Sequence, residues 1–148
     1  MEDLDESSEI WSIIKTNTMS THSTLHISRM NNEQNDWLRG LEFYKQELQI
    51  HTHRLSDVSG MYDSKADLKP NVEHFQNQFI VQRENIDHLA HDLGFFEKKV
   101  SHETQEMAQH INASTLAEHD VLRDRYTTLE TAINDLRHEH NKFLAKYI

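Results

Sequence analysis

The feature that most constrains this chain is an apolar stripe in its middle, where hydrophobic residues recur three and four positions apart. Between residues 70 and 110 the stripe consists of Val72, Phe75, Phe79, Ile86, Leu89, Leu93, Phe96 and Val100. An α-helix has about 3.6 residues per turn, so this spacing places all of these side chains on one side of a helix. Such a stripe must be buried, and it therefore predicts a long helix packed against other helices.

Two further segments show the same alternation. Residues 32–60 contain a stripe made of Trp37, Leu41, Tyr44, Leu48, His51, Leu55 and Val58. Residues 115–147 contain a second one, made of Leu116, His119, Leu122, Tyr126, Leu129, Ile133, Leu136, His140, Phe143 and Tyr147. Strict alternation of four-residue and three-residue steps is typical of the knobs-into-holes packing of coiled coils. The three stripes predict an all-α protein whose helices pack along their lengths.

The connections between these helices are expected to be short. The chain has only three Gly and one Pro, and Pro70 suits the first turn of a helix, where its missing N–H is not needed. Thr115 and Glu118 have the spacing of a capping box for the last helix. Residues 31–148 therefore predict an up-down-up antiparallel three-helix bundle. Gly40 is less favourable than Ala inside a helix by about 1 kcal/mol, so we expect an aromatic ring to approach it closely.

Residues 1–30 predict a separate N-terminal segment. The Ser- and Thr-rich residues 16–30 resemble a tether. Before them, after an acidic leader, the sequence predicts a short amphipathic helix formed around Ile10, Trp11, Ile13 and Ile14. The first long helix would then leave a groove uncovered beside residues 96–126. We expect the short helix to fill this groove and make that end of the bundle four-helical; the alternative is a dimer in which a second copy fills it.

Charge and composition argue against several functions. The formal net charge is -10, whereas nucleic acids and anionic membranes attract clustered Lys and Arg. The chain has no cysteine, which excludes disulfides, thiolate catalysis and cysteine-ligated zinc. No apolar run approaches the roughly 20 residues of a membrane span, and the acidic N-terminus is unlike a signal peptide. These features favour a cytoplasmic protein that binds neither nucleic acid nor membrane.

Histidine is frequent, with 12 residues, while the sequence motifs of enzymes are missing. Most of the histidines are expected on solvated helix faces, where protonating all of them would move the formal charge from -10 to +2. A pH-responsive surface is therefore one hypothesis. The sequence has no glycine-rich phosphate loop, no nucleophile elbow and no recognisable catalytic triad, so we expect no enzymatic activity.

Polar residues interrupt the three stripes near one level of the predicted bundle. Counting outward from the two turns places at similar heights Glu47, His51, Gln82, Arg83, Glu84 and His140. One interpretation is a buried polar layer that fixes helix register. The other is a metal site with His51 and His140 as ligands. Glu47 or Glu84 would supply its carboxylate, and such a set suits Zn or non-haem Fe. The Glu-x-x-His pattern of ferritin-like proteins is missing, which favours the polar layer.

Other histidines are weaker candidates for a metal site. His88 and His91 lie on one face of the middle helix, where a solvated surface with ion pairs is the simpler interpretation. His22 and His26 stand four residues apart in the expected tether. His119 lies on an apolar stripe, and a single core histidine of this kind is usually hydrogen-bonded rather than a ligand.

Two stretches resemble a group of small, uncharacterised helical-bundle proteins of Bacteroidetes-type bacteria. They are residues 37–48, WLRGLEFYKQEL, with Arg54 and Leu55, and residues 73–79, EHFQNQF, with residues 86–92, IDHLAHD. The resemblance covers about the first two long helices. It implies a helical bundle and a bacterial cytoplasmic setting, and it implies no particular activity.

The sequence therefore supports two functional hypotheses. The first is a non-enzymatic bundle that acts through protein–protein contact, with either a helical partner or a second copy in the groove beside residues 96–126. The second is a metal-binding bundle that uses the layer of His51 and His140.

Overall fold

The computed structural model describes residues 3–61, 68–106 and 110–147; within the first helix, the side chains of residues 3–7 and 12–25 are outside this description. The described residues form three α-helices and no strand: α1 is Asp3–Met61, α2 is Leu68–Glu106 and α3 is Ala113–Leu144. All three helices pack against one another. The prediction of an all-α three-helix bundle is therefore confirmed.

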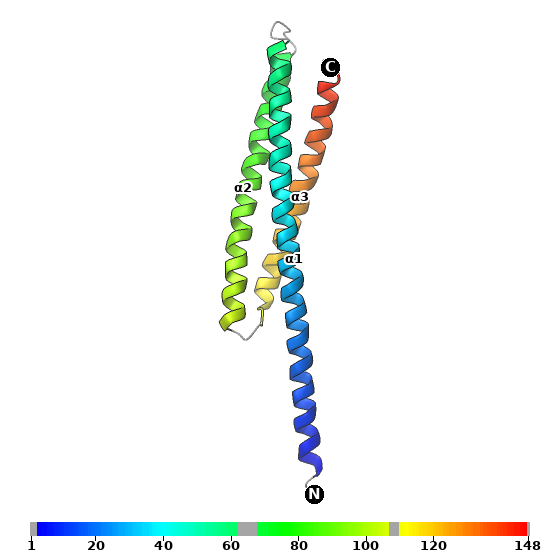
Figure 1. Ribbon diagram of the computed structural model, residues 1–148, viewed down its shortest axis with the longest axis vertical. Coiled ribbons are helices and arrows are strands. Elements are labelled where there is room, and N and C mark those ends of the chain that lie inside the picture. Colours follow the sequence, from blue (N-terminus) through cyan, green and yellow to red (C-terminus); the bar gives the residue numbers. More distant parts are fainter. Residues whose placement is uncertain (1–2, 62–67, 107–109, 148) are drawn as a thin grey trace.

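The helices run up, down and up, so that α1 and α3 are parallel and α2 is antiparallel to both (Figure 1). Side chains that join α1 to α3 are separated by nearly the same number of residues at each height. The separation is 86 residues for Tyr44 and Glu130, 90 for Glu47 and Arg137, and 89 for His51 and His140. A constant separation is the mark of two parallel helices in fixed register.

The three predicted stripes form the core. Leu41 and Leu55 of α1, Ile86, Leu89 and Leu93 of α2 and Ile133 of α3 are almost completely buried. Burying one such side chain contributes about 1.5–3 kcal/mol relative to leaving it exposed. The core is therefore a narrow column of apolar side chains between three helices.

The N-terminal third of the chain differs from the prediction. Residues 3–29 are helical, as expected for part of them, but they are the beginning of α1 rather than a short helix followed by a tether. The alternation continues upstream, because Met30 is buried and Ile27 is half-buried. Ser and Thr are mediocre helix formers but do not break helices, and no Gly or Pro precedes Gly40.

The expected groove beside residues 96–126 is covered by α1 itself. Met30, Gln34 and Trp37 are buried at this end of the bundle, as are Phe96, Val100 and Leu122. Ile10 is 56% exposed and Trp11 is 65% exposed, so they do not fill that groove. The expected contribution of Ile13 and Ile14 concerns side chains outside the described residues.

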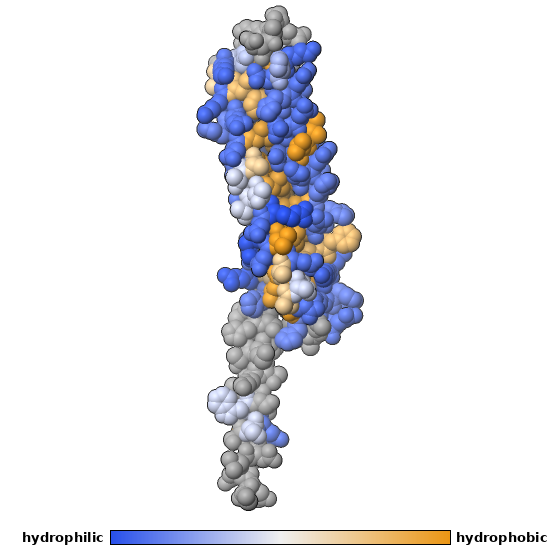
Figure 2. All heavy atoms as spheres, turned by 180° about the vertical axis from the view of Figure 1, so that it is seen from behind, coloured by the Kyte–Doolittle hydropathy of each residue, from blue (hydrophilic) through white to orange (hydrophobic). Residues whose placement is uncertain are grey.

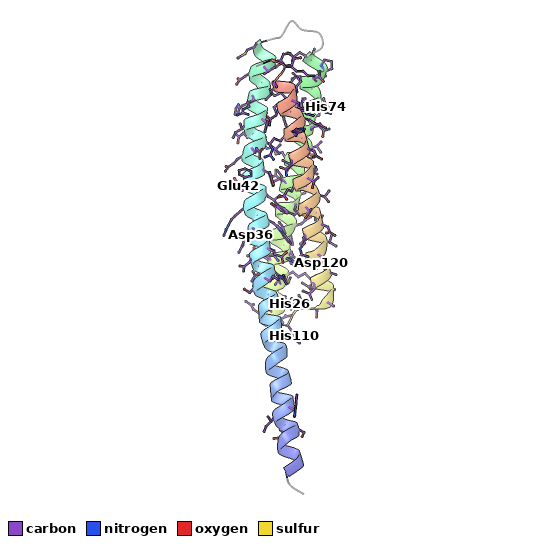
Figure 3. All side chains as sticks on the ribbon, turned by 90° about the vertical axis from the view of Figure 1, so that its right-hand side faces the viewer. His26, Asp36, Glu42, His74, His110 and Asp120 are labelled. Atoms are coloured by element: carbon purple, nitrogen blue, oxygen red, sulfur yellow. The ribbon has the colours of Figure 1, made fainter. Side chains whose placement is uncertain are left out.

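The first part of α1 extends past the turn between α2 and α3 and away from the bundle (Figure 1). Figure 3 shows His26 on α1 close to the height of His110, which lies in that turn. We call the part of α1 from Asp3 to Arg29 the N-terminal extension. It has neither α2 nor α3 beside it over most of its length.

The start of α3 also differs from the prediction. The helix begins at Ala113 after Asn112, and no side-chain hydrogen bond caps it. Thr115 is fully buried and donates its hydroxyl hydrogen bond to Glu103 of α2 at 3.0 Å, while Glu118 accepts from Lys99 of α2. The predicted capping box is therefore wrong, because both of its side chains join α3 to α2.

Candidate functional site

The predicted polar layer contains a pair of histidines between α1 and α3. His51 and His140 are both buried, and their Nδ1 atoms lie 2.7 Å apart. This is a hydrogen-bond distance, so one Nδ1 donates and the other accepts. Register counting therefore predicted correctly that these two histidines meet.

The surrounding groups indicate which nitrogen carries the hydrogen. Nε2 of His51 lies 3.9 Å from a carboxylate oxygen of Glu47, whereas Nε2 of His140 is buried without a hydrogen-bond partner among the described residues. A buried N–H without an acceptor is rarer in proteins than a buried acceptor without a donor. The arrangement therefore favours an Nδ1–H of His140 that donates to Nδ1 of His51, whose Nε2–H faces Glu47.

Aromatic rings enclose the buried end of the pair. The ring of His140 lies 4.8 Å from Phe79, edge to face, and 5.1 Å from Phe75. Burial lowers the pKa of His140 to about 4, helped by the nearby His51 and Arg54, and burial also lowers the pKa of His51. Both histidines are therefore neutral at pH 7, as a hydrogen-bonded layer in the core requires.

The other predicted members do not join this layer. Arg83 and Glu84 are exposed, and Gln82 is half-buried between α2 and α3. Glu47 lies at the edge of the layer and accepts a 2.7 Å hydrogen bond from Arg137. Register counting places residues along the bundle axis, but each step along a helix also turns the side chain by about 100°. Residues next to each other in sequence therefore share a height without sharing a face.

The metal-site interpretation gains no support from this geometry. Among the described residues, no group of three or more His, Asp or Glu side chains is arranged to hold a metal ion. Two ligands of a tetrahedral zinc ion, each about 2.0–2.1 Å from it, would lie about 3.3 Å apart. The 2.7 Å separation of His51 and His140 is shorter, as expected for a direct hydrogen bond. His26, His88 and His91 are exposed, and the side chain of His22 is outside the described residues.

A second polar site lies between α1 and α3, nearer the N-terminal extension. His119 is buried against the rings of Trp37 and Phe96, with centroids 4.9 and 5.8 Å away, and burial lowers its pKa. Its Nε2 lies 3.6 Å from a carboxylate oxygen of Glu33, which accepts hydrogen bonds of 2.7 and 3.0 Å from Arg123. Asp120, labelled in Figure 3, also binds Arg123. The site is a network of ion pairs around one buried histidine.

Gln34 is a buried polar residue that the sequence interpretation missed. It is 2% exposed, and both atoms of its side-chain amide lack hydrogen-bond partners among the residues described. It lines a depression of about 300 Å³ between α1 and α2, with Asn31, Asn35 and Ser101. The signal was present, because Met30, Gln34 and Trp37 continue the four–three spacing upstream of the expected helix start.

An open groove lies between α2 and α3. It has a volume of about 440 Å³ and is lined by Gln82, Asn85, His88, Leu89, Val121, Asp124, Arg125, Thr128, Leu129 and Ala132. Arg125 binds Asp92 across it, and Lys99 binds Glu118 nearby. Val121 is 57% exposed, and Phe95 beside Asp92 and Lys99 on α2 is also exposed. Figure 2 shows that apolar residues form a lengthwise band on one face of the bundle, between hydrophilic borders.

Comparisons with known proteins give no match from which the fold or the sites could be interpreted. No family model, curated protein or solved structure matches this chain. The resemblance to small bundle proteins of Bacteroidetes-type bacteria stays a prediction. None of the helices, over the residues that the structure describes, has an apolar stretch long enough to cross a membrane.

Proposed function

We propose that this protein is a non-enzymatic helical bundle that acts through protein–protein contact, and that its N-terminal extension mediates self-association. The observation that supports this proposal is the exposure of Ile10 and Trp11 on a helix that continues beyond the bundle. Trp is among the residues most enriched at the energetic centres of protein interfaces. We also propose a cytoplasmic setting, in keeping with the acidic, cysteine-free composition.

A helical extension of this kind has little stability in water unless another part of a protein packs against it. In proteins most of the stability of a helix comes from packing of its apolar face, and the extension is rich in Ser and Thr, which are mediocre helix formers. Its helicity is supported at one end only, where α1 enters the bundle. Packing against another helix would add support along its length. Burying Ile10 and Trp11 would contribute about 1.5–3 kcal/mol for each side chain.

The buried sites of the bundle support a structural role better than a catalytic one. His51 and His140 are neutral, mutually hydrogen-bonded and enclosed by phenylalanine rings. The groups around His119 are already engaged in ion pairs. Both sites hold α1 and α3 together, which leaves the exposed surfaces to carry the function.

Light scattering coupled to size-exclusion chromatography over a range of protein concentrations tests the proposal. We expect the natural sequence to dimerise and Ile10→Ser/Trp11→Ser to remain monomeric, with an unchanged free energy of unfolding at low concentration. Phe43→Ser is the matched control, because Phe43 is a comparably exposed apolar residue on the bundle part of α1. A natural sequence that stays monomeric at every concentration would contradict self-association.

A further inference from the structure

We infer that the N-terminal extension of one copy docks into the groove between α2 and α3 of a second copy, as a fourth helix. This inference rests on the proposed self-association and names the surface that receives the extension. The groove is the one defined above, with Val121 at its exposed apolar border and Leu89 and Leu129 at its base.

The groove has the composition that a docked helix requires. Two neighbouring helices of a bundle leave a furrow in which a further helix can lie, at an interaxial distance of about 8–10 Å. Thr128 and Ala132 are small side chains that line this furrow, and Val121 at its border is 57% exposed.

The heights of the two surfaces agree. The ion pair between Lys45 and Asp87 fixes α1 against α2 and places residue 26 of α1 level with the end of α2 at Glu106. Trp11 precedes residue 26 by about 15 residues, which is about 22 Å along a helix. If the second bundle begins where the first one ends, Trp11 lies this distance from the end of the second copy's α2 and reaches about residue 91. Trp11 would therefore lie near Phe95 and Val121, which are both exposed.

A two-fold axis allows both extensions to dock at once. In this arrangement the two bundles meet end to end, each with its turn between α2 and α3 at the junction. The α1 helix of each copy then continues straight out of its own bundle and along the other bundle. This arrangement requires α1 to run straight past that turn, as it does in Figure 1. The contact is closed and self-complementary, as in most homodimers. A specific interface needs roughly 1,000 Å² of buried area in total, and two docked helices would both contribute to it.

Pairing of the two extensions with each other would bury less apolar surface. In the extension, the apolar residues concentrate between Ile10 and Ile14, and the flanks are acidic on one side and rich in Ser and Thr on the other. Two extensions could match these short apolar segments but would place polar flanks against polar flanks. In the groove, the exposed side chains of Val121 and Phe95 would instead contact the same segment.

Cysteine cross-linking tests the contact, because the chain has no cysteine of its own and each variant then carries one thiol. A tagged Ile10→Cys protein is mixed with an untagged Phe95→Cys protein under mild oxidation. We expect a mixed disulfide between the two. Tagged Ile10→Cys mixed with untagged Phe43→Cys is the control and should give at least tenfold less, because Phe43 lies on α1. A disulfide that forms only between two Ile10→Cys chains would overturn the inference in favour of pairing between the extensions.

A substitution in the groove gives a second, independent readout by light scattering. Val121→Glu changes a side chain that is 57% exposed, so the fold should survive, while a carboxylate at the apolar border should weaken the dimer at least tenfold. Phe43→Glu should leave the dimer unchanged. A dimer that resists Val121→Glu but is lost in Ile10→Ser/Trp11→Ser would overturn the groove as the receiving surface and leave self-association standing. The absence of any dimer would overturn both, and species that keep growing with concentration would overturn the two-fold arrangement.

Discussion

Gly40 provides a direct test of how α1 packs against α3. It lies inside α1, where Ala is normally favoured over Gly by about 1 kcal/mol. A Cβ atom added at this position would overlap the hydroxyl oxygen of Tyr126 and lie 3.0 Å from its Cζ atom. Non-bonded carbon atoms prefer separations of about 3.5–4.0 Å. Ala therefore fits at Gly40 only if the tyrosine ring or the helix moves.

The ring of Tyr126 has little freedom to move aside. It is half-buried and stacks on Trp37, with the ring centroids 6.1 Å apart. Burial and the nearby Glu130 and Tyr44 raise the pKa of its hydroxyl to about 12, which reflects the confined position of that group. Overpacking of this kind typically destabilises a protein by about 1–3 kcal/mol. Most of this range exceeds the helix-propensity gain of about 1 kcal/mol, so Gly40→Ala should lower the free energy of unfolding by up to about 2 kcal/mol net.

Urea unfolding followed by far-UV circular dichroism measures the effect, and Gly94→Ala is the matched control. Gly94 lies inside α2 with no atom within 4 Å of an added Cβ, so Ala should stabilise the protein there by up to about 1 kcal/mol. Tyr126→Phe removes the oxygen atom that makes the shortest contact. In the Gly40→Ala background this second change should recover part of the lost stability, because the Cζ contact remains.

The two glycine substitutions should thus have opposite signs. If Gly40→Ala stabilised the protein as much as Gly94→Ala, Tyr126 would not lie over Gly40. The register of α1 against α3 would then be different from the one described here. Equal destabilisation by Gly40→Ala with and without Tyr126→Phe would also contradict the proposed steric cause.

Three further predictions concern polar side chains in the core or at its edge. Burial keeps the pKa of His51 below the ordinary histidine value of 6.5 and that of His140 at about 4, so the unfolded chain takes up protons first as the pH falls. The free energy of unfolding should therefore decrease by roughly 2–3 kcal/mol between about pH 6.5 and pH 4, and a flat profile in urea titrations would contradict this. Gln34→Leu removes two buried amide atoms that lack partners among the described residues, and it should stabilise the protein by about 1 kcal/mol in the same assay; clear destabilisation would show that this amide is hydrogen-bonded. Arg137→Met breaks a partly exposed ion pair with Glu47 and should cost no more than about 1 kcal/mol, with thermal unfolding as the check.

The bundle could be predicted from the sequence because its core follows one strong signal. Apolar residues at four–three spacing, such as Phe75, Phe79 and Leu93, are buried as the periodicity requires. The meeting of His51 and His140 could also be predicted, because short turns fix the relative heights of the helices. Rotation about each helix axis is not fixed in this way, so Arg83 and Glu84 were placed at the right height but on the wrong face.

The start of α1 could not be predicted by the same reasoning. Ser- and Thr-rich residues resemble a linker in composition, yet they are tolerated in a helix that is nucleated and held at one end by a packed core. The first long helix was expected to begin near residue 31, but Met30 and Gln34 are buried residues that continue the stripe across this boundary. Short capping patterns are weak signals, because the same side chains can instead form hydrogen bonds with another helix, as Thr115 and Glu118 do.

The polar contacts between α1 and α3 connect the buried sites to the proposed function. Glu33 with Arg123, Tyr44 with Glu130, Glu47 with Arg137 and His51 with His140 join the two helices at four heights. The two partly exposed ion pairs among them, Glu33–Arg123 and Glu47–Arg137, contribute little stability, but a slip of α1 by one turn would break all four contacts together. These contacts therefore fix where α1 leaves the bundle. That position determines the height of Trp11 relative to a second copy, so the same residues that align the bundle also set the register of the proposed dimer.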